Sequence, residues 1–451
     1  MTILTRSAAR HSASAITAAL LTAGCGLLDT QQPNIIDPGT LNSPEAAQSL
    51  RNGALADFAF VKDGDGTQFT DGLILVAGLL SDEFVHSTTP PSEQEIDQRT
   101  TATINPSLSD VYRNLHKARA GAEVAAEALQ TYLVDPTATT DIAEMQSIAG
   151  FTYVYFGEDF CSGVPFSSVR GDSITFGQPQ TTVEMFTTAL AKFDSALAQP
   201  GLAVDDGSIT NLALLGRARA LLDLGQYADA ASAVAAVPTD FSYDTEHADS
   251  PQRLQNAIWS YTNGGLWSVS DAEGGNGLPY LSAEDPRVPA DSLDDDGDGF
   301  ADPGLDLITP QYSLGKYPDA SSPVPVADGI EARLIEAEAQ LQANNFSGMT
   351  TTLNDLRHTA IRPALPNLSS AGNREAAIDQ LFSERAFWLY ATGHRLGDMR
   401  RLIRVYGRDA ETVFPTGAYH KNGTYGTDVN LPIPVEEQNN PNARGCLDRN
   451  A

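Results

Sequence analysis

The stretch "LFSERAFWLYATGHRLGDMRRL", residues 381–402, places charges of both signs on either side of Gly393. Such charges could form a binding site. An ion-paired, partly buried junction between two helices explains them better, because breaking such a network is costly while the network alone supplies no chemistry. His394 fits this junction as a structural histidine rather than a base. The charged residues are Glu384, Arg385, Arg395, Asp398 and Arg401.

Two segments before this stretch, residues 218–234 and 337–353, resemble each other at a constant offset of 119 residues. The first resembles a tetratricopeptide hairpin, in which a small residue closes one helix and an aromatic residue begins the next. Such hairpins cannot bury both faces alone and must stack on neighbours. We therefore expect an α-solenoid core whose repeats are not contiguous. The corresponding positions are Gly225, Tyr227 and Ala230 with Asn344, Phe346 and Met349.

Most other segments also have helical periodicity, and they predict a mostly α fold. The ranges are 43–60, 107–133, 141–157 and 181–199, the last beginning with a capping box from Thr181 to Glu184. No run alternates with period two for long enough to predict a real sheet. Residues 239–327 are irregular and rich in glycine, proline, aspartate and aromatic residues. An irregular stretch of this length on a helical scaffold is usually functional.

The C-terminal third carries a family resemblance. Residues 330–361, "IEARLIEAEAQLQANNFSGMTTTLNDLRHTAI", are followed by the 381–402 stretch and by "VNLPIPVEEQNNPN", residues 429–442. This succession closely resembles the SusD/RagB family of outer-membrane nutrient-binding lipoproteins. Leu396 stands where the family usually has an aromatic residue. The matching positions are Arg333, Glu336, Ala337, Glu338, Asn354, Arg357, Glu384, Arg385, Gly393, His394, Arg395, Asp398, Arg401, Pro432, Ile433, Pro434 and Asn440.

The resemblance spans nearly all of the expected mature chain and implies both a fold and a role. SusD-like proteins are mostly helical, with tetratricopeptide-like hairpins and a variable, loop-rich face. They cover a SusC-like TonB-dependent barrel and deliver ligands to it, commonly oligosaccharides and in some cases peptides. They catalyse no reaction. We therefore expect no organic cofactor and no catalytic residue.

The N-terminus predicts export and a lipid anchor. Arg6 and Arg10 precede a short apolar run that ends in "LLTAGCGLLDT", residues 20–30. A basic start, a short apolar core and small residues before a break are typical of a secretory signal. Ala23-Gly24-Cys25 resembles the bacterial lipobox, in which the cysteine is acylated. We expect a signal peptide at 1–24, lipidation of Cys25, a tether at 25–40 and a helical domain at 41–451 on the outer cell surface. The alternative is an ordinary signal peptide with a cysteine nearby.

The composition restricts the partners. The chain has 28 basic and 58 acidic residues, which give a formal net charge of −30. Such a surface repels nucleic acid and anionic lipid, and it suits neutral ligands or cations. Two cysteines remain besides Cys25. Cys161 and Cys446 could pair in an oxidising compartment, although the sequence alone does not bring them within bridging distance.

Ligand contacts are expected from aromatic residues on loops. Two of the three tryptophans lie in one glycine-rich part of the 239–327 stretch. A flat indole ring can stack on the apolar face of a sugar, while nearby polar groups bind its hydroxyls. Anchoring of the loop into the core is the alternative for each residue. The candidates are Trp259, Tyr261, Trp267 and Tyr280, with Phe84, His86 and Arg99 in a second loop.

The segment "SLDDDGDGFADPGLD", residues 292–306, contains the D-x-D-x-D-G beginning of a calcium loop. Position twelve is Leu305 rather than a bidentate glutamate, although Asp306 follows. A solvated acidic turn is the alternative. The sequence predicts a structural Ca²⁺ held by Asp294, Asp296, Asp298, Asp302 and the backbone carbonyl of Phe300.

Two further functions remain open at this level. A tetratricopeptide lipoprotein that assembles other proteins would use the same scaffold. A helical glycoside hydrolase is less favoured, because no pair of carboxylates stands out among the many acids.

Overall fold

In the computed structural model, the structure describes residues 43–133, 138–170, 173–202, 207–294, 297 and 300–450. The expected signal peptide, Cys25 and nearly all of the tether lie outside these residues, as do Asp296 and Asp298. Lipidation and the signal peptide therefore stay predictions.

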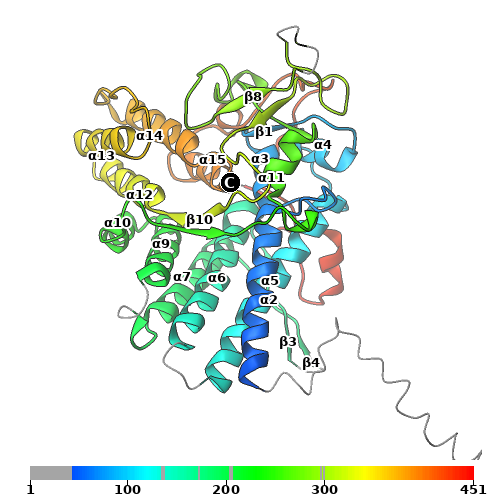
Figure 1. Ribbon diagram of the computed structural model, residues 1–451, viewed down its shortest axis with the longest axis vertical. Helices are drawn as coiled ribbons and strands as arrows, with labels where there is room; N and C mark the ends of the chain where they lie inside the picture. The colour runs from blue at the N-terminus through cyan, green and yellow to red at the C-terminus, as the bar shows by residue number, and fades with distance from the viewer. Residues whose placement is uncertain are drawn as a thin grey trace, which may run out of the picture.

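Eight helices form a continuous stack, drawn from blue to yellow in the lower and left parts of Figure 1. Each helix contacts the next in the series. The stack confirms the predicted solenoid, including the separation of its two hairpins along the chain. The helices are α2 (Pro44–Asp63), α5 (Pro106–Tyr132), α6 (Ala138–Asp159), α7 (Thr182–Leu197), α9 (Gly207–Asp223), α10 (Tyr227–Val234), α12 (Gly329–Gln342) and α13 (Phe346–Thr359).

The two hairpins, α9–α10 and α12–α13, share a turn geometry. Gly225 has φ +75° and Asn344 has φ +57°, so the equivalent residues both adopt the left-handed conformation. Glycine and asparagine adopt it more readily than other residues. The two hairpins, which the sequence matched at an offset of 119 residues, therefore also share the backbone conformation of this turn.

Side-chain caps explain where several helices begin. The Ser43 hydroxyl accepts a hydrogen bond from Ala46 N at 3.2 Å, and Pro44 occupies the first turn of α2. The predicted capping box of α7 is present in full: Thr181 N donates to the Glu184 carboxylate at 2.7 Å, and Glu184 N donates to the Thr181 hydroxyl at 3.3 Å.

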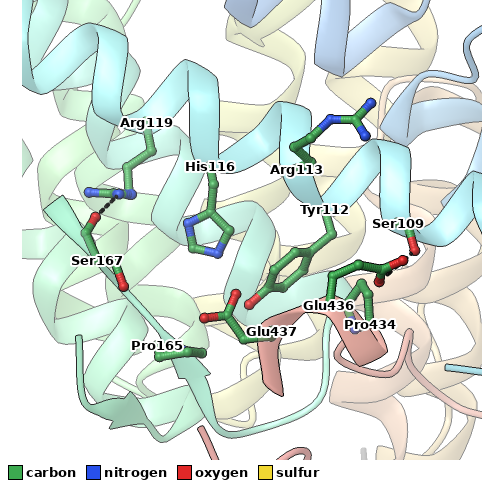
Figure 2. Close-up of a pocket in the computed structure, with 10 residues that line it drawn as sticks. All are labelled: Ser109, Tyr112, Arg113, His116, Arg119, Pro165, Ser167, Pro434, Glu436 and Glu437. Atoms are coloured by element: carbon green, nitrogen blue, oxygen red, sulfur yellow. Dashed lines mark hydrogen bonds between the residues drawn. The ribbon is translucent and has the colours of Figure 1, made fainter. Parts of the chain in front are cut away.

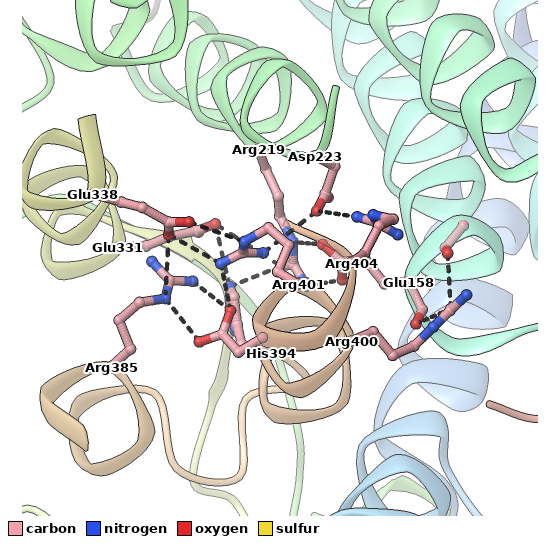
Figure 3. Close-up of polar contacts among 12 residues, drawn as sticks. Glu158, Arg219, Asp223, Glu331, Glu338, Arg385, His394, Arg400, Arg401 and Arg404 are labelled. Atoms are coloured by element: carbon pink, nitrogen blue, oxygen red, sulfur yellow. Dashed lines mark hydrogen bonds and ion pairs between the residues drawn. The ribbon is translucent and has the colours of Figure 1, made fainter. Parts of the chain in front are cut away.

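The charged stretch that opens the sequence analysis forms α14 (Arg374–Trp388) and α15 (Arg395–Arg404), which are joined at Gly393. Asp398 accepts from Arg385 Nε at 2.7 Å and from Arg401 at 2.7 Å, and Arg401 also binds Glu338 (Figure 3). These side chains are at most 3% exposed. The predicted ion-paired junction is confirmed for Arg385, Asp398 and Arg401. The other two predicted members are ion-paired elsewhere, Glu384 with Arg287 and Arg357 and Arg395 with Asp82.

His394 lies inside the junction. Its Nε2 accepts from Arg219 at 2.8 Å, and its Nδ1 lies 2.8 Å from the Thr392 hydroxyl. Burial and the neighbouring Arg219 charge hold the pKa of His394 well below its usual value. The ring is therefore neutral and structural, as expected.

Several of the remaining elements are short and gather into a loop-rich part at the top of Figure 1. They include a helix, α11, inside the stretch expected to be irregular. The helices are α3 (Leu73–Leu80), α4 (Pro91–Asp97), α11 (Ala257–Asn263), α16 (Ala410–Val413), η2 (Gln252–Leu254), η3 (Glu273–Gly275) and, at the tail, η4 (Val435–Asn439).

Every sheet in the described residues has two strands, in agreement with a mostly α fold. The pairs are antiparallel: β1 (Phe84–His86) with β7 (Trp267–Val269), β2 (Val164–Pro165) with β5 (Pro179–Gln180), β3 (Ser168–Arg170) with β4 (Ser173–Thr175), β6 (Ser242–Thr245) with β10 (Val324–Asp328), and β8 (Ala290–Ser292) with β9 (Tyr312–Leu314).

The C-terminal tail docks on the end of α6. Leu431 N donates to Asp159 O at 2.8 Å, and Cys161 N donates to Leu431 O at 2.9 Å, so the "LPIP" segment is extended and buried. Cys161 and Cys446 form a disulfide with a Cα–Cα separation of 5.7 Å, which fixes the tail covalently. No helix among the described residues has the length and apolar character needed to cross a membrane.

Candidate functional site

Six of the seven predicted ligand residues are buried. Phe84, Trp267 and Tyr280 are 0% exposed, and Tyr261 is 2% exposed. The Tyr261 and Trp267 rings are 5.1 Å apart, and Trp267 and Phe84 are 6.5 Å apart. These rings anchor the loops to the core, which is the alternative that the sequence left open, and in this conformation they present no face to a ligand.

His86 and Arg99 are also interior groups. His86 is 0% exposed, and its Nδ1 accepts from Lys421 Nζ at 2.9 Å; burial, together with the Lys421 and His420 charges, lowers the pKa of His86 to about 3. Arg99 is 1% exposed, donates to Pro415 O at 2.6 Å and lies over the Phe414 ring. Both residues hold the 411–428 segment against the rest of the loop-rich part.

Trp259 and Trp388 lie on helices. Trp259 is half-buried on α11 and packs against the core, so it is the one candidate whose ring is partly accessible. Trp388 is buried on α14, and its indole N–H donates to Glu384 at 3.3 Å.

A pocket of about 380 Å³ opens in the loop-rich part, next to the predicted residues. We call it the loop-face pocket. It lies between the β1–β7 pair, the loop before β9 and the 418–425 loop. Its lining residues are Val85, residues 268–274, Leu281, Ile308, Thr309, Pro310, Tyr312, Ala418, His420 and Tyr425.

Strand geometry explains why the predicted residues Phe84 and His86 do not line this pocket although Val85, between them, does. Successive side chains of a strand point to opposite faces. In β1, Phe84 and His86 point into the core, while Val85 between them is half-exposed and lines the pocket. In β7, by contrast, Trp267 and the lining residue Ser268 are both buried, so the alternation of exposure is seen in β1 only.

The accessible rings of the pocket come from segments that the sequence analysis did not select. Tyr312 and Tyr425 are half-buried, and His420 is exposed. The exposed Asp271 supplies a carboxylate beside them, whereas the buried Ser268 and Thr309 hydroxyls donate to Pro310 O and Asp306. Such a combination of ring faces with a few polar groups is typical of small-molecule sites. Aromatic residues between glycines were the signal used for 259–280, and "GAYHKNGTYG", residues 417–426, has the same composition.

One carboxylate shapes the rim of the pocket. Asp306 accepts from the backbone N–H groups of Ile308 and Thr309, both at 2.9 Å, and from the Thr309 hydroxyl at 2.6 Å. Leu307, at the tip of this turn, has φ +60° and is 81% exposed. A left-handed leucine is an unusual conformation that needs support from its surroundings. Asp306 supplies that support, so the rim next to Ile308 is held in one shape.

Two buried carboxyl groups lie under the pocket. Asp97 accepts from His86 N at 3.0 Å and from the Tyr419 hydroxyl at 2.7 Å, and Glu273 accepts from the Tyr425 hydroxyl at 2.9 Å. Burial raises the pKa of Asp97, and burial with the adjacent Asp97 charge raises that of Glu273. Asp97 and Glu273 therefore hold Tyr419 and Tyr425, the two tyrosines of the 417–426 loop, in place.

The acidic loop is only partly described. Asp294 accepts from Gly297 N at 2.8 Å, and the backbone of Asp302 pairs with Leu293 and Gln311. Asp306 is engaged by Thr309 and Lys421 instead. Within the described ranges, no cluster of three or more His, Cys, Asp or Glu side chains is arranged to hold a metal ion. The Ca²⁺ prediction, which includes Asp296 and Asp298, remains untested.

Solved structures share this arrangement of helical stack and loop-rich part. A SusD superfamily protein from Bacteroides thetaiotaomicron aligns with TM-score 0.67 and 13% identity over 90% of this chain and 100% of that one. A SusD-like protein from Bacteroides fragilis aligns with TM-score 0.65 and 14% identity over 91% and 98%. A SusD-like carbohydrate binding protein from the same species aligns with TM-score 0.64 and 15% identity over 89% and 99%.

The chain therefore has the fold of the SusD superfamily, and the resemblance seen in the C-terminal third is confirmed at the level of the fold. Because the sequence identities are low, the similarity to these structures establishes the fold alone. No protein-family model matches the sequence, and no curated protein matches it.

Proposed function

We propose that this chain is a nutrient-binding protein of the outer cell surface that captures an oligosaccharide in the loop-face pocket. A short peptide is the alternative ligand. The observation that carries the proposal is the pocket itself, which combines the accessible rings of Tyr312, Tyr425 and His420 with polar groups of neighbouring loops. Its volume of about 380 Å³ is within the range of small-molecule sites. Structures with the same fold that are described as carbohydrate binding support the class of ligand.

In this proposal each kind of group has its own task. Tyr312 offers a ring face on which the apolar side of a sugar can stack. Asp271, which lines the pocket and is exposed, can bind hydroxyl groups. The formal net charge of −30 favours a neutral ligand over an anionic one.

We also propose that the ligand is bound and not cleaved. Glu273 is the buried acid of the pocket, and it accepts a hydrogen bond from Tyr425. A glycoside hydrolase needs one carboxylate as acid and a second as base or nucleophile at the scissile bond. Asp97, next to Glu273, is 1% exposed and bonded to Tyr419 and His86. Asp271, the other carboxylate of the lining, accepts from the backbone N–H groups of Leu281 and Ser282.

Titration calorimetry of the purified protein against oligosaccharides and short peptides tests the ligand. We expect one oligosaccharide class to bind, and Tyr312→Ala to weaken it about tenfold through the lost ring contact. The matched control is Phe176→Ala, an exposed ring after β4, which should bind as the wild type does. Wild-type affinity in a folded Tyr312→Ala variant overturns the assignment to this pocket, and binding of peptides alone overturns the ligand class.

The delivery step is a further part of the proposal: the protein hands its ligand to a SusC-like TonB-dependent transporter. The expected anchor at Cys25 would hold it at the same membrane. Affinity purification from detergent-solubilised outer membranes should recover a large β-barrel protein with the wild type. A Cys25→Ala variant should lose the membrane fraction. Recovery of the wild type without any barrel partner, or from the inner membrane only, argues against delivery.

We propose, finally, that the 294–302 loop binds Ca²⁺, on the strength of its D-x-D-x-D-G sequence. Titration with CaCl₂ should give a weak site, about 10⁻⁴–10⁻³ M, as in extracellular modules. The double variant Asp296→Asn/Asp298→Asn should lose it, while Asp249→Asn, at an exposed acid elsewhere, should keep it. Equal heats from both variants would reject the site.

A further inference from the structure

A second pocket, of about 330 Å³, lies between α5, the β2 region and the C-terminal segment at η4. We call it the α5 pocket. It shares no lining residue with the loop-face pocket. Figure 2 shows Tyr112 and His116 projecting from α5 toward Glu437, with Pro165 and Pro434 also in the wall.

The α5 wall consists of polar residues from successive turns of one helix. Tyr112, His116 and Arg119 are spaced by four and three residues, so they lie on the same face. A helix face turned toward the protein interior normally carries apolar residues. These three are held in place by neighbouring aromatic rings. The His116 ring lies 4.4 Å from Phe156 and 4.6 Å from Tyr112.

His116 presents an unused hydrogen-bonding atom. Its Nε2 is buried and has no hydrogen-bond partner among the described residues. Burial and the Arg119 charge hold the pKa of His116 well below its usual value. The ring is therefore neutral at neutral pH, and a buried polar atom of this kind is usually satisfied in a functional state of a protein.

Arg119 has a second atom without a partner. Its guanidinium donates to Glu123 and to Ser167 O, both at 2.6 Å, while its Nε has no partner among the described residues. The residue is 4% exposed, so these bonds fix the position of Nε. The pocket wall thus holds two preset polar atoms on adjacent turns of α5.

The charges of the α5 pocket do not favour an anion. Arg113 pairs with Asp110 at 2.7 Å and Arg119 with Glu123 at 2.6 Å, while Glu436 and Glu437 add two carboxyl groups to the lining. Burial raises the pKa of Tyr112 and of Glu437, and the two groups face each other. A neutral ligand is therefore favoured over an anion, because the arginines of the lining already have carboxylate partners. Proline rings and the Tyr112 ring supply apolar surface beside the polar atoms.

From these features we infer that the α5 pocket is a second binding site, for a single neutral sugar residue or the end of a glycan. Hydroxyl groups of the ligand would pair with His116 Nε2 and Arg119 Nε, and its ring would lie against Tyr112. The inference shares the ligand class of the proposed function but not its pocket.

The test uses NMR of the full chain with free monosaccharides as the probe: glucose, galactose, mannose and N-acetylglucosamine. We expect one of them to shift the His116 ring resonance, which a His116→Gln spectrum assigns. Ser109→Trp places a large ring at the half-exposed rim of the α5 pocket. It should weaken monosaccharide binding at least about tenfold. Tyr312→Ala, in the loop-face pocket, should leave the His116 shift unchanged.

The outcomes separate this inference from the proposed function. A His116 shift that persists in Tyr312→Ala and disappears in folded Ser109→Trp supports the α5 site, whether or not the loop-face pocket binds glycans. Absence of a shift with all four sugars overturns it, as does an undiminished shift in Ser109→Trp. A response to inorganic phosphate instead of sugars overturns the neutral-ligand assignment.

Discussion

Lys421 Nζ lies 2.8 Å from Asp306 Oδ2, and the two side chains are only 7% and 5% exposed. The same ammonium group donates to Thr88 O at 2.6 Å and to His86 Nδ1 at 2.9 Å. One lysine therefore joins the segment after β1, the rim at Asp306 and the 417–426 loop. These are three of the segments that form the loop-face pocket.

Replacement of this lysine should loosen the pocket. Lys421→Met leaves the Asp306 carboxylate without its cation in a buried position, and we expect the free energy of unfolding to fall by about 3 kcal/mol. Ligand affinity should fall with it. Urea unfolding measures the first effect and calorimetry the second. Lys117→Met is the matched control, because Lys117 pairs with Asp57 at 2.7 Å but is 65% exposed, and its loss should cost less than about 1 kcal/mol.

The pH dependence of this ion pair has a defined sign. Burial alone would raise the pKa of Asp306, but the hydrogen bonds from Lys421 and Thr309 outweigh it and lower the pKa to about 2. The stabilisation is therefore fully present above the unfolded value of about 4, and it is lost as the pH falls through 2. Equal urea midpoints for wild type and Lys421→Met at pH 7 would contradict the proposal that the Lys421–Asp306 ion pair stabilises the fold.

The repeat turn offers a test of backbone conformation. Gly225→Ala should destabilise the protein by about 1–2 kcal/mol, because φ +75° is unfavourable for a residue with a Cβ. Steric crowding is not the cause, since the added Cβ would meet only Tyr227, at 3.9 Å. Thermal unfolding checks the expectation.

The control for this change has the opposite sign. Gly53 lies inside α2, and a Cβ added there would meet nothing within 4 Å. Gly53→Ala should therefore stabilise the protein by about 0.5–1 kcal/mol, through the higher helix propensity of alanine. If both substitutions shift the melting temperature in the same direction, the left-handed turn is not what sets the outcome at Gly225.

The helical part could be predicted because its determinants are local. Helical periodicity, the Ser43 cap and the capping box at Thr181 each depend on residues within one or two turns. The turn residues Gly225 and Asn344 could be matched by position alone. The disulfide could be suggested but not assigned, because its two cysteines are 285 residues apart and meet only through the docking of the tail.

The loop-rich part could not be predicted at the level of side chains. An aromatic residue in an irregular segment either anchors the loop or faces solvent, and composition does not distinguish the two. Phe84 and Trp267 are buried because their short strands pair with each other, in a register that joins residues about 180 positions apart. Tyr312 and Tyr425 reach the same pocket from still other segments.

Removal of the disulfide should weaken the attachment of the tail. We expect the double variant Cys161→Ala/Cys446→Ala to lose about 2–4 kcal/mol of unfolding free energy, because the bond closes a long loop in the unfolded chain. Urea unfolding of wild type with and without dithiothreitol measures the same loss. The double variant should not respond to the reductant. An equal response in both proteins would show that the effect has another origin.

Buried acids should make the protein less stable as the pH rises from 5 to 8. Burial, with a smaller contribution from Asp82, raises the pKa of Glu83 to about 8, although Ala391 N donates to its carboxylate at 2.8 Å. Burial also raises the pKa of Asp71 to about 6 and of Glu331 to about 7. Between the unfolded value of about 4 and these values, the native state keeps protons that the unfolded state releases. The contribution of these acids to the free energy of unfolding therefore falls with rising pH.

Glu83→Gln should flatten this dependence, because glutamine cannot ionise, and each unit of pKa difference corresponds to about 1.4 kcal/mol. Urea unfolding at pH 5, 6, 7 and 8 gives the slope. Glu184→Gln is the control, because hydrogen bonds from Thr181 lower the pKa of this exposed glutamate, which is then ionised in both states above pH 5. Its slope should equal that of the wild type. A Glu83→Gln slope as steep as the wild type's would mean that Glu83 is already ionised in the folded protein.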